Sequence, residues 1–478
     1  MKKILYLIIS FVFIFSLTSC SCGNDDEGLL ESSSLYVPTL KAYLENDIDG
    51  NYTYTYPFNT TISLVYFDSS IEDVEEYFKS EYIKLHQLFD RHYYYFDASG
   101  NLVNNLRIIN ESNGNSISVD QDLIDIFKEG IRFTKLSKGK FNIGVGNLSD
   151  LWDKFISFGS TSSYIDIAAT TRYSYQNGVY TEDIVGEYVY LPDYDIYINT
   201  ANIKKYVYQE GLYVESSSGT YIFTNAVAPT EEQIAQAKLC IPSYENIEKV
   251  IVINDENNTI TINNKIDGCN SNITITLGAL AKSYAAEKIA SNSKIKDGNY
   301  LINAGQSTIK ILGSNRAREN GDWNIGVTDS YLVYKQGIKQ ASYLMKISNP
   351  LSVSTSSGDE NHYFYGTNYY HHIIDPLSGY PKQNRFAVTA VSENAMYADI
   401  VTTSLMSMTM DESIEFLSNL KDNGITMEIL IQEKVDNNVK VYVTNSMNEW
   451  VSKRAIETMT DYLNSIVIEE FSYDSKEE

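Results

Sequence analysis

The chain has 478 residues, of which 43% are hydrophobic and 13% aromatic, and its formal net charge at pH 7 is −25. This length and composition can bury the core of one large or two ordinary domains, which excludes an intrinsically disordered protein. The negative charge, which no basic tract compensates, argues against nucleic-acid binding and requires a local countercharge, such as a bound metal, wherever a polyanionic substrate binds.

The first twenty residues, MKKILYLIISFVFIFSLTSC, have the order of a secretory signal. Two lysines precede an apolar run that is too short for a stable transmembrane helix, and the run ends in Leu-Thr-Ser-Cys. This ending resembles a bacterial lipobox, in which Cys20 becomes lipid-modified. We therefore expect a signal peptide over residues 1–19, a polar tether over 20–50, and an extracytoplasmic protein that is lipid-anchored to the bacterial cell membrane. The alternative is an ordinary signal peptide with an incidental cysteine.

The pattern of apolar, β-branched and turn residues predicts the elements that follow. A strand is expected over Thr55 to Phe67. In residues 157–225, Tyr, Ser and Thr alternate with Gly-rich breaks, which indicates short hairpins inserted into a larger framework. Helical spacing predicts helices over residues 71–90, 122–139, 231–239, 277–290 and 394–408. Further strands are expected over residues 309–313, 323–328 and 386–392.

Strands and helices alternate without a regular βαβ period, which predicts the α+β class. We expect one large mixed domain over residues 51–465, with a β-rich insertion at 157–225 and an acidic tail over 466–478.

One predicted helix carries two oxygen donors. In MYADIVTTSLM, Asp399 and Thr403 are four residues apart and project from one helical face. A carboxylate and a hydroxyl so placed suit Mg²⁺, which prefers hard ligands and keeps positions open for phosphate oxygens. The alternative is that Asp399, near a helix start, is only a cap.

Two further stretches suit the binding of an anionic ligand. TLGALAKSYAAEKIA puts a Gly-containing turn before a helix with Lys282 in its first turns, although a solvated lysine would give the same pattern. KLSKGKFNIGVGNLSDLW has glycines that let the backbone approach a ligand, or it is only a tight turn that leads into a strand. Because GxxxxGK[ST] and GxGxxG are both absent, neither a Walker nor a Rossmann site is predicted.

The stretch YYHHIIDPLSGYP, residues 369–381, places two histidines before an Asp-Pro and Ser-Gly turn. Histidine is the side chain most easily poised near neutral pH, and this turn would hold it at the end of a strand; a packed or solvated pair is the alternative. Cys240 and Cys269 could pair outside the cell, but two cysteines without CxxC or His spacing make no metal site and no disulfide framework, and whether they are bonded stays open.

Taken in order, these stretches resemble the ApbE family of FAD:protein FMN transferases. The resemblance covers about residues 55–450 apart from the insertion, and HIIDP followed by the spaced Ala-Asp-x-x-x-Thr is its most specific part. The counterparts of the family's motifs are PFNTTISL, SKGKFNIGVGNLSDLW, TLGALAKSYAAE, LINAGQSTI, STSSGDENHYF, HHIIDPLSGYP and YADIVTTSL.

The resemblance implies a Mg²⁺-dependent enzyme that transfers the FMN half of FAD to a Thr or Ser hydroxyl of an exported acceptor protein and releases AMP. The metal would be held by Asp399, Thr403 and the main-chain oxygen of Ala279. His372 would take the proton of the acceptor, and Asp375 would fix its loop. The residues that would contact FAD are Phe58, Phe141, Asn142, Lys282 and His372.

Some positions depart from the family pattern. Thr276 replaces an aspartate before Leu-Gly, Ser283 and Gln306 replace glycines, and Asn142 replaces an aspartate. The metal pair and the HIIDP loop are intact, which favours a working enzyme over an inactive relative. Two other functions stay open: an FAD-binding lipoprotein that scavenges or stores flavin, and a Mg²⁺-dependent FAD pyrophosphatase in which water replaces the acceptor hydroxyl.

Overall fold

The computed structural model describes residues 57–67, 72–163, 228–263, 266–348, 350–365, 368–435, 438–453 and 466–473, and the backbone of short strands within 39–55 and 173–215. The predicted signal peptide, Cys20 and most of the tether lie outside these residues. None of the described helices combines the length and the apolar character that a bilayer span requires.

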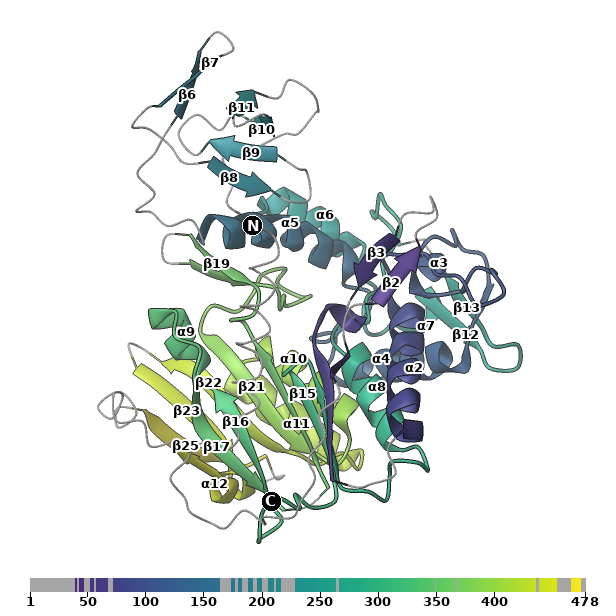
Figure 1. Ribbon diagram of the computed structural model, residues 1–478, viewed down its shortest axis with the longest axis vertical. Helices are drawn as coiled ribbons and strands as arrows, with labels where there is room; N and C mark the ends of the chain where they lie inside the picture. The colour runs from purple at the N-terminus through teal and green to yellow at the C-terminus, as the bar shows by residue number, and fades with distance from the viewer. Residues whose placement is uncertain are drawn as a thin grey trace.

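The largest sheet among the described residues has nine strands and lies in the lower part of the molecule in Figure 1. Its neighbouring strands are antiparallel, except that β23 and β25 run parallel. In spatial order the strands are β1 (Thr39–Leu40), β4 (Ile62–Tyr66), β14 (Tyr300–Ala304), β15 (Thr308–Leu312), β18 (Ser352–Ser357), β21 (Arg385–Ser392), β22 (Glu428–Val435), β23 (Asn438–Thr444) and β25 (Val467–Phe471).

Each face of this sheet buries its own hydrophobic core, because successive strand side chains point to opposite faces. In β22, Ile429 and Ile431 join the larger core, whereas Leu430 joins the smaller one. The larger core is covered by α2 (Glu72–Phe89), α4 (Gln121–Leu136), α8 (Ala281–Ala290), α10 (Ala395–Met406) and α11 (Met410–Asp422). The smaller core is covered by β16 (Trp323–Thr328), β17 (Ala341–Ile347), β24 (Val451–Lys453), α9 (Ser330–Gln336) and α12 (Asn445–Trp450).

A third, smaller core surrounds Trp152, whose indole N–H donates to Gly379 O at 2.8 Å. It lies between α5 (Gly146–Ser163), α6 (Glu231–Leu239) and the hairpin of β19 (His362–Tyr365) and β20 (Asn368–His371). This core therefore supports the loop that follows β20.

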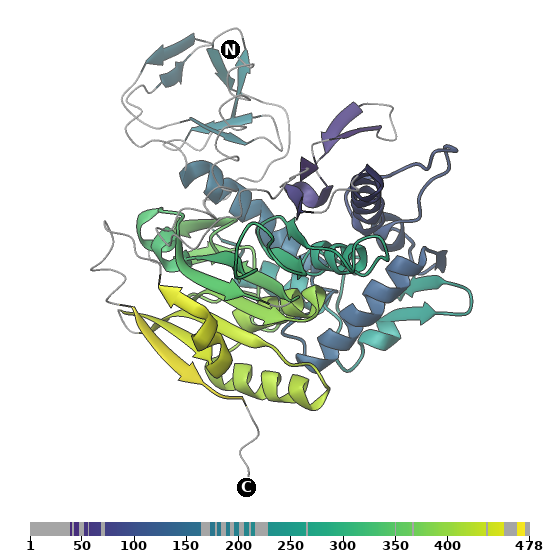
Figure 2. The same cartoon turned by 60° about the horizontal axis from the view of Figure 1, so that its bottom comes forward.

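The remaining elements lie at the periphery. One group is α3 (Leu106–Asn110), α7 (Ile247–Val250) and the small sheet of β5 (Ile117–Ser118), β12 (Ile251–Asn254) and β13 (Thr259–Ile262). A hairpin of β2 (Tyr43–Asn46) and β3 (Tyr52–Thr55) precedes the 3-10 turn η1 (Pro57–Asn59). Beyond α5, at one end of the molecule in Figures 1 and 2, lie β6 (Tyr173–Gln176), β7 (Val179–Glu182), β8 (Tyr188–Leu191), β9 (Ile196–Asn199), β10 (Lys205–Gln209) and β11 (Leu212–Glu215).

The α+β class is confirmed, as are the five predicted helices, which correspond to α2, α4, α6, α8 and α10. Helix α8 begins four residues later than expected, because the turn at residues 277–280 precedes it. The strands expected over residues 309–313, 323–328 and 386–392 correspond to β15, β16 and β21.

Two predictions need correction. The single strand expected over Thr55 to Phe67 is broken by η1, in which Phe58 and Asn59 both have φ 54, a left-handed conformation that no strand accommodates. The segment expected as an acidic tail from residue 466 contributes β25 to the nine-stranded sheet, where Glu469 pairs with Lys440 of β23 at 2.7 Å. The domain therefore continues to Phe471 at least.

The stretch KLSKGKFNIGVGNLSDLW was also considered as a tight turn that leads into a strand. In the structure it leads into the helix α5 instead. This helix ends at Ser163 and so passes the expected start of the insertion at residue 157.

Candidate active site

Helix α10 carries the two predicted side-chain metal ligands, Asp399 and Thr403, one turn apart. The helix begins at the cap residue Asn394, whose side chain accepts from Tyr397 N at 3.0 Å. It packs against β18 and β21 on one side and α8 on the other, which is why it is apolar nearly all round. Thr403 Oγ1 lies 3.1 Å from Ser356 Oγ, the last inward-facing hydroxyl of β18. Asp399 is thus well inside the helix and does not cap it.

Asp399 has an open position for a cation. It is 5% exposed, and among the residues that the structure describes its Oδ2 atom has no hydrogen-bond partner. Burial raises the pKa of Asp399 to about 6, against the opposing effects of the Lys282 charge and of hydrogen bonding by Ser283 and Thr308. A buried carboxylate oxygen without a partner is costly, and a bound cation would remove that cost. The donor chemistry at this position therefore fits a metal.

The turn before α8 supplies the other predicted groups. Among the described residues, no main-chain N–H donates to the carbonyl oxygen of Ala279, so this oxygen is available as a ligand. Lys282 lies in the first turn of α8 and is half-buried, and no carboxylate of the described part of the chain lies within ion-pair distance of it. The N-cap residue Leu280 makes no side-chain cap, which leaves N–H groups at the helix start for an anion.

The predicted ligand set contains one carboxylate, one hydroxyl and one carbonyl. The described residues hold no cluster of three or more His, Cys, Asp or Glu side chains suited to a metal. A set of this kind resembles Mg²⁺ sites that are completed by substrate phosphates and water.

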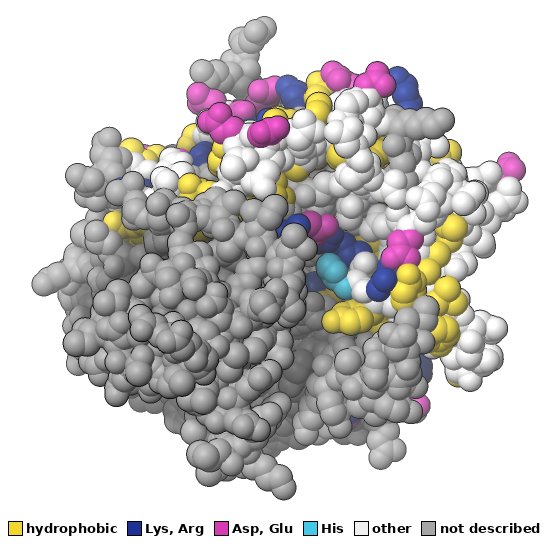
Figure 3. Space-filling model, turned by 90° about the horizontal axis from the view of Figure 1, so that it is seen from above, with side chains coloured by type: hydrophobic (Ala, Val, Ile, Leu, Met, Phe, Trp, Pro, Cys, Tyr) yellow, Lys and Arg dark blue, Asp and Glu magenta, His cyan; other side chains and the backbone are white. Residues whose placement is uncertain are grey.

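The two adjacent histidines occupy different environments. His371, the last residue of β20, is fully buried; its Nε2 donates to Lys382 O at 3.1 Å, its Nδ1 accepts from Ile373 N at 3.3 Å, and burial lowers its pKa to about 3. His372 is half-buried on the opposite side, in agreement with the alternation of strand side chains. Figure 3 shows the molecule from above, where basic, acidic and histidine side chains gather at a hollow of the surface.

His372 shares its electrostatic environment with Asp399. Burial lowers the pKa of His372, while Glu360 and a hydrogen bond to Asn361 O act in the opposite direction and Lys282 lowers it further. Lys282 and Glu360 also act on the pKa of Asp399. The Nδ1 atom of His372 faces Asn361 O at 3.4 Å and must donate to it, so Nε2 is the acceptor nitrogen. Among the described residues, Nε2 has no hydrogen-bond partner.

Asp375 shapes the loop after His372. Its main-chain N–H donates to Tyr380 O at 3.1 Å, its carbonyl accepts from Gly379 N at 2.8 Å, and its Oδ1 atom accepts from Leu377 N at 3.0 Å. Its other oxygen lies 3.3 Å from Lys140 Nζ. These contacts close the Asp-Pro-Leu-Ser-Gly turn, which is the role expected for this residue.

Phe58 is held in its left-handed conformation by a buried histidine. Its N–H donates to Nδ1 of His86 at 3.1 Å, and its ring meets the His86 ring edge to face at 5.4 Å. Burial lowers the pKa of His86, which favours the neutral form that can accept from Phe58 N. The Phe58 side chain is half-buried, so part of it remains available to a ligand.

Phe141 and Asn142 are both buried, at 4% and 6% exposure. The Asn142 amide donates to Pro242 O at 2.8 Å and accepts from Gly144 N at 2.9 Å, so both ends of this side chain already have partners. Phe141 packs in the larger core, and its N–H is bonded to Ser137 Oγ at 3.0 Å. Contact of these two side chains with FAD stays a prediction.

Sequence reasoning missed two residues that the structure brings to the site. Ser356 contacts Thr403, and Glu360 acts electrostatically on both His372 and Asp399. Both stand in the quoted stretch STSSGDENHYF. The signal for Ser356 was the alternation of β18, which places Ser354 and Ser356 on the face that α10 covers. Glu360 follows β18, and this alternation gives no signal for it.

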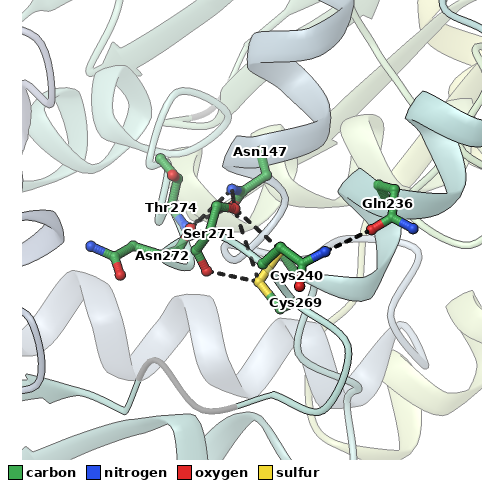
Figure 4. Close-up of a disulfide and its surroundings, with 8 residues drawn as sticks. Asn147, Gln236, Cys240, Cys269, Ser271, Asn272 and Thr274 are labelled. Atoms are coloured by element: carbon green, nitrogen blue, oxygen red, sulfur yellow. Dashed lines mark hydrogen bonds between the residues drawn. A yellow bond between two sulfur atoms is a disulfide. The ribbon is translucent and has the colours of Figure 1, made fainter.

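Cys240 and Cys269 form a disulfide, which settles the question their spacing left open (Figure 4). It joins the end of α6 to the segment that leads toward Ala279. Asn147 of α5 holds the next residues of that segment by donating to Asn272 O at 2.9 Å and accepting from Thr274 N at 2.8 Å. The disulfide and Asn147 therefore both fix the segment that precedes Ala279.

Comparison with known proteins identifies the family of this chain. Residues 58–203 and 211–427 match the sequence model of the ApbE family. The FAD:protein FMN transferase of Klebsiella pneumoniae is 29% identical over 150 residues, covering 31% of this chain and 43% of that protein. The protein of the same name from Vibrio cholerae is 28% identical over 182 residues, covering 37% and 50%. The chain spans about half the length of the curated relatives it matches.

Solved structures show the same fold. The flavin transferase ApbE from Vibrio cholerae matches with a TM-score of 0.53 at 15% identity and covers 87% of this chain and 99% of its own. The ApbE protein from Thermotoga maritima matches with a TM-score of 0.52 at 18% identity, covering 90% and 99%. These identities support the fold alone. Because the family model covers well over half of the sequence, the chain belongs to the ApbE family.

Proposed function

We propose that this protein is an FAD:protein FMN transferase that requires Mg²⁺ and transfers FMN from FAD to a Thr or Ser hydroxyl of an exported acceptor protein, with release of AMP. The observation that carries the proposal is the open, buried Oδ2 atom of Asp399, which lies in the same electrostatic environment as Lys282 and His372. Membership of the family and the names of the matched relatives support the same activity.

The chain's own groups have separate roles in this reaction. Asp399, Thr403 and the Ala279 carbonyl would hold the cation, which supplies neutralisation of the negative charge on the pyrophosphate of FAD. Lys282 and the N–H groups at the start of α8 would bind the remaining phosphate oxygens.

His372 would accept the proton through Nε2 as the acceptor hydroxyl oxygen forms a bond to the FMN phosphorus. The bond from that phosphorus to the bridging oxygen breaks, and AMP leaves with the electron pair. Because its pKa is lowered, His372 is neutral at pH 7 and able to act as this base.

We also propose that the protein is exported and lipid-anchored through Cys20. The signal-like N-terminus supports this location, and so does the disulfide, since such bonds persist in oxidising compartments.

The test follows AMP and covalent flavin together when the full chain in detergent is incubated with FAD, Mg²⁺ and an acceptor domain bearing a flavinylation threonine. The proposal expects both products in equal amounts, and their loss in Asp399→Ala and His372→Ala variants. AMP without labelled acceptor would indicate a pyrophosphatase, and FAD binding without either product would indicate a flavin-binding lipoprotein.

A further inference from the structure

The C-terminal end of α10 is held by three cationic side chains, of which Lys382 and Arg385 come from one segment and Lys140 from another. Main-chain oxygens at this end carry the negative pole of the helix and lack intrahelical partners, so cations stabilise them. The contacts are from Arg385 to Leu405 O at 2.6 Å, from Lys140 to Ser407 O at 3.2 Å, and from Lys382 to Met408 O.

Of these three side chains, Lys140 is the one that pairs with Asp375 in the loop after His372. Lys382 stands at the end of that loop, and its main-chain oxygen accepts from His371 Nε2 at 3.1 Å. Lys140 Nζ lies 3.3 Å from Asp375 Oδ2 and 3.5 Å from Glu412 Oε1. The Lys140 and Asp375 side chains are only 15% and 10% exposed, so solvent screens this pair weakly. The Lys140 ammonium group therefore joins the C-terminal end of α10 to the carboxylate that closes the loop after His372.

Lys140 also directly precedes Phe141 and Asn142 in the chain. Three segments that carry predicted site residues thus meet at this single side chain, although none of the predicted ligands of FAD or metal is among its contacts. On its solvent side it lines a surface groove of about 1170 Å³ between the end of α4 and α11, which includes none of the predicted site residues.

We propose that Lys140 is a positioning residue for FMN transfer, which fixes the loop of His372 relative to the helix of Asp399 by bridging Asp375 to Ser407 O. This inference rests on the proposed function. Transfer requires the acceptor oxygen, the phosphorus and the base to be aligned within a fraction of an ångström. Loss of the bridge would let the loop move relative to α10 without removing any group that binds FAD.

The test compares Lys140→Met, which keeps the alkyl stem, with Lys140→Arg, which can still reach both oxygens. We expect Lys140→Met to lower kcat for transfer by about tenfold to a hundredfold while KM for FAD stays within about twofold. Lys140→Arg should restore most of the rate. The matched control is Lys138→Met, because Lys138 pairs with Glu415 at 2.6 Å on the surface, where both side chains are about two-thirds exposed, and its loss should leave both constants unchanged.

A second measurement needs neither FAD nor metal. Hydrogen exchange of the amides of residues 372–380 should become faster in Lys140→Met than in the unmodified protein and in Lys138→Met. An unchanged exchange rate, an unchanged kcat in Lys140→Met, or a Lys140→Arg variant as slow as Lys140→Met would each overturn the inference. If the unmodified protein transfers no FMN, the proposed function itself fails, and the inference fails with it.

Discussion

At the scale of single residues, the buried carboxylate of Asp399 lowers the stability of the metal-free protein, although the proposed function needs it as a metal ligand. A carboxyl group whose pKa is about 6 in the folded chain and near 3.8 in the unfolded chain costs the metal-free fold about 3 kcal/mol at pH 7. Because the folded pKa is the higher one, this cost is absent below pH 4, develops between pH 4 and 6, and is complete above pH 6.

Asp399→Asn should therefore raise the free energy of unfolding of the metal-free protein, by up to about 3 kcal/mol at pH 7.5 and by nearly nothing at pH 4. Urea unfolding in EDTA at the two pH values measures this difference. Asp122 is the useful contrast, because this buried carboxylate is paired with Lys84 and Lys288, so Asp122→Asn should destabilise the fold at pH 7.5. An Asp399→Asn variant less stable than the unmodified protein at pH 7.5 would contradict the assignment of an unpaired carboxylate.

His372 is expected to act in the chemical step and hardly in binding. Within the described part of the chain its Nε2 atom has no hydrogen-bond partner, and its pKa is lowered, so His372→Ala removes a base while the proposed metal ligands and Lys282 stay in place. Transfer should slow by about 10²-fold to 10⁴-fold, and FAD affinity measured by fluorescence quenching should change by less than about threefold. A loss of FAD affinity as large as the loss of rate would make His372 a binding residue.

At the scale of elements, the turn between β14 and β15 shows what one departure from the family pattern does. Gln306 stands at a glycine position of the family pattern, and its φ of 64 is left-handed. Gly305 directly before it has no room for a Cβ atom, because such an atom would lie 2.5 Å from Thr60 Oγ1. The turn therefore keeps the glycine-type conformation although one glycine is lost.

Gln306→Gly should remove the energetic cost of a left-handed conformation at a non-glycine residue. The left-handed region costs a non-glycine residue roughly 1 kcal/mol or more, and glycine loses about 0.5 to 1 kcal/mol through its freedom in the unfolded chain, so we expect a net gain of up to about 1 kcal/mol. The neighbouring Ser307→Gly, at a position outside the left-handed region, should instead destabilise by about 0.5 to 1 kcal/mol. Thermal unfolding compares the two variants, and the same sign for both would contradict this account.

The helices were predictable from sequence because their apolar spacing and caps are local signals. The α4 helix is an example, with the cap Asp120 and buried residues at Ile124, Phe127 and Ile131. The break at Pro57–Asn59 was not predictable in this way, because its left-handed residues are stabilised by His86, which is 28 residues distant from Phe58. Likewise, the short acidic segment Val467–Phe471 becomes a strand only through its pairing with β23.

At the scale of the whole molecule, the order of the sheet could not be derived from the sequence, since neighbours such as β4 and β14 are more than 230 residues apart. The candidate site could be predicted from the sequence only through its motifs. Asp399, Lys282 and His372 come from three distant segments, and spacing alone says nothing about their common electrostatic environment. Lys140, Ser356 and Glu360 lie within the quoted stretches, but nothing in the sequence singles them out, and their roles emerged only from the folded chain.

The disulfide is expected to contribute to global stability. It closes a segment with a sequence separation of 29, for which loss of chain entropy in the unfolded state corresponds to about 3 to 4 kcal/mol. Reduction should lower the free energy of unfolding by up to this amount, as measured by urea unfolding with and without a phosphine reductant. A Cys240→Ala, Cys269→Ala double variant should be insensitive to the reductant. Equal stability of the oxidised and reduced proteins would show that the bond does not form in solution.

The most direct test of the account is the affinity for FAD measured by calorimetry, with Mg²⁺ and with EDTA, in the unmodified protein and in Asp399→Asn. If Asp399 holds a cation against the pyrophosphate, Mg²⁺ should raise FAD affinity at least about tenfold, and this gain should vanish in Asp399→Asn. Equal FAD affinity with and without Mg²⁺ in the unmodified protein, or a gain that Asp399→Asn retains in full, would contradict the central claim.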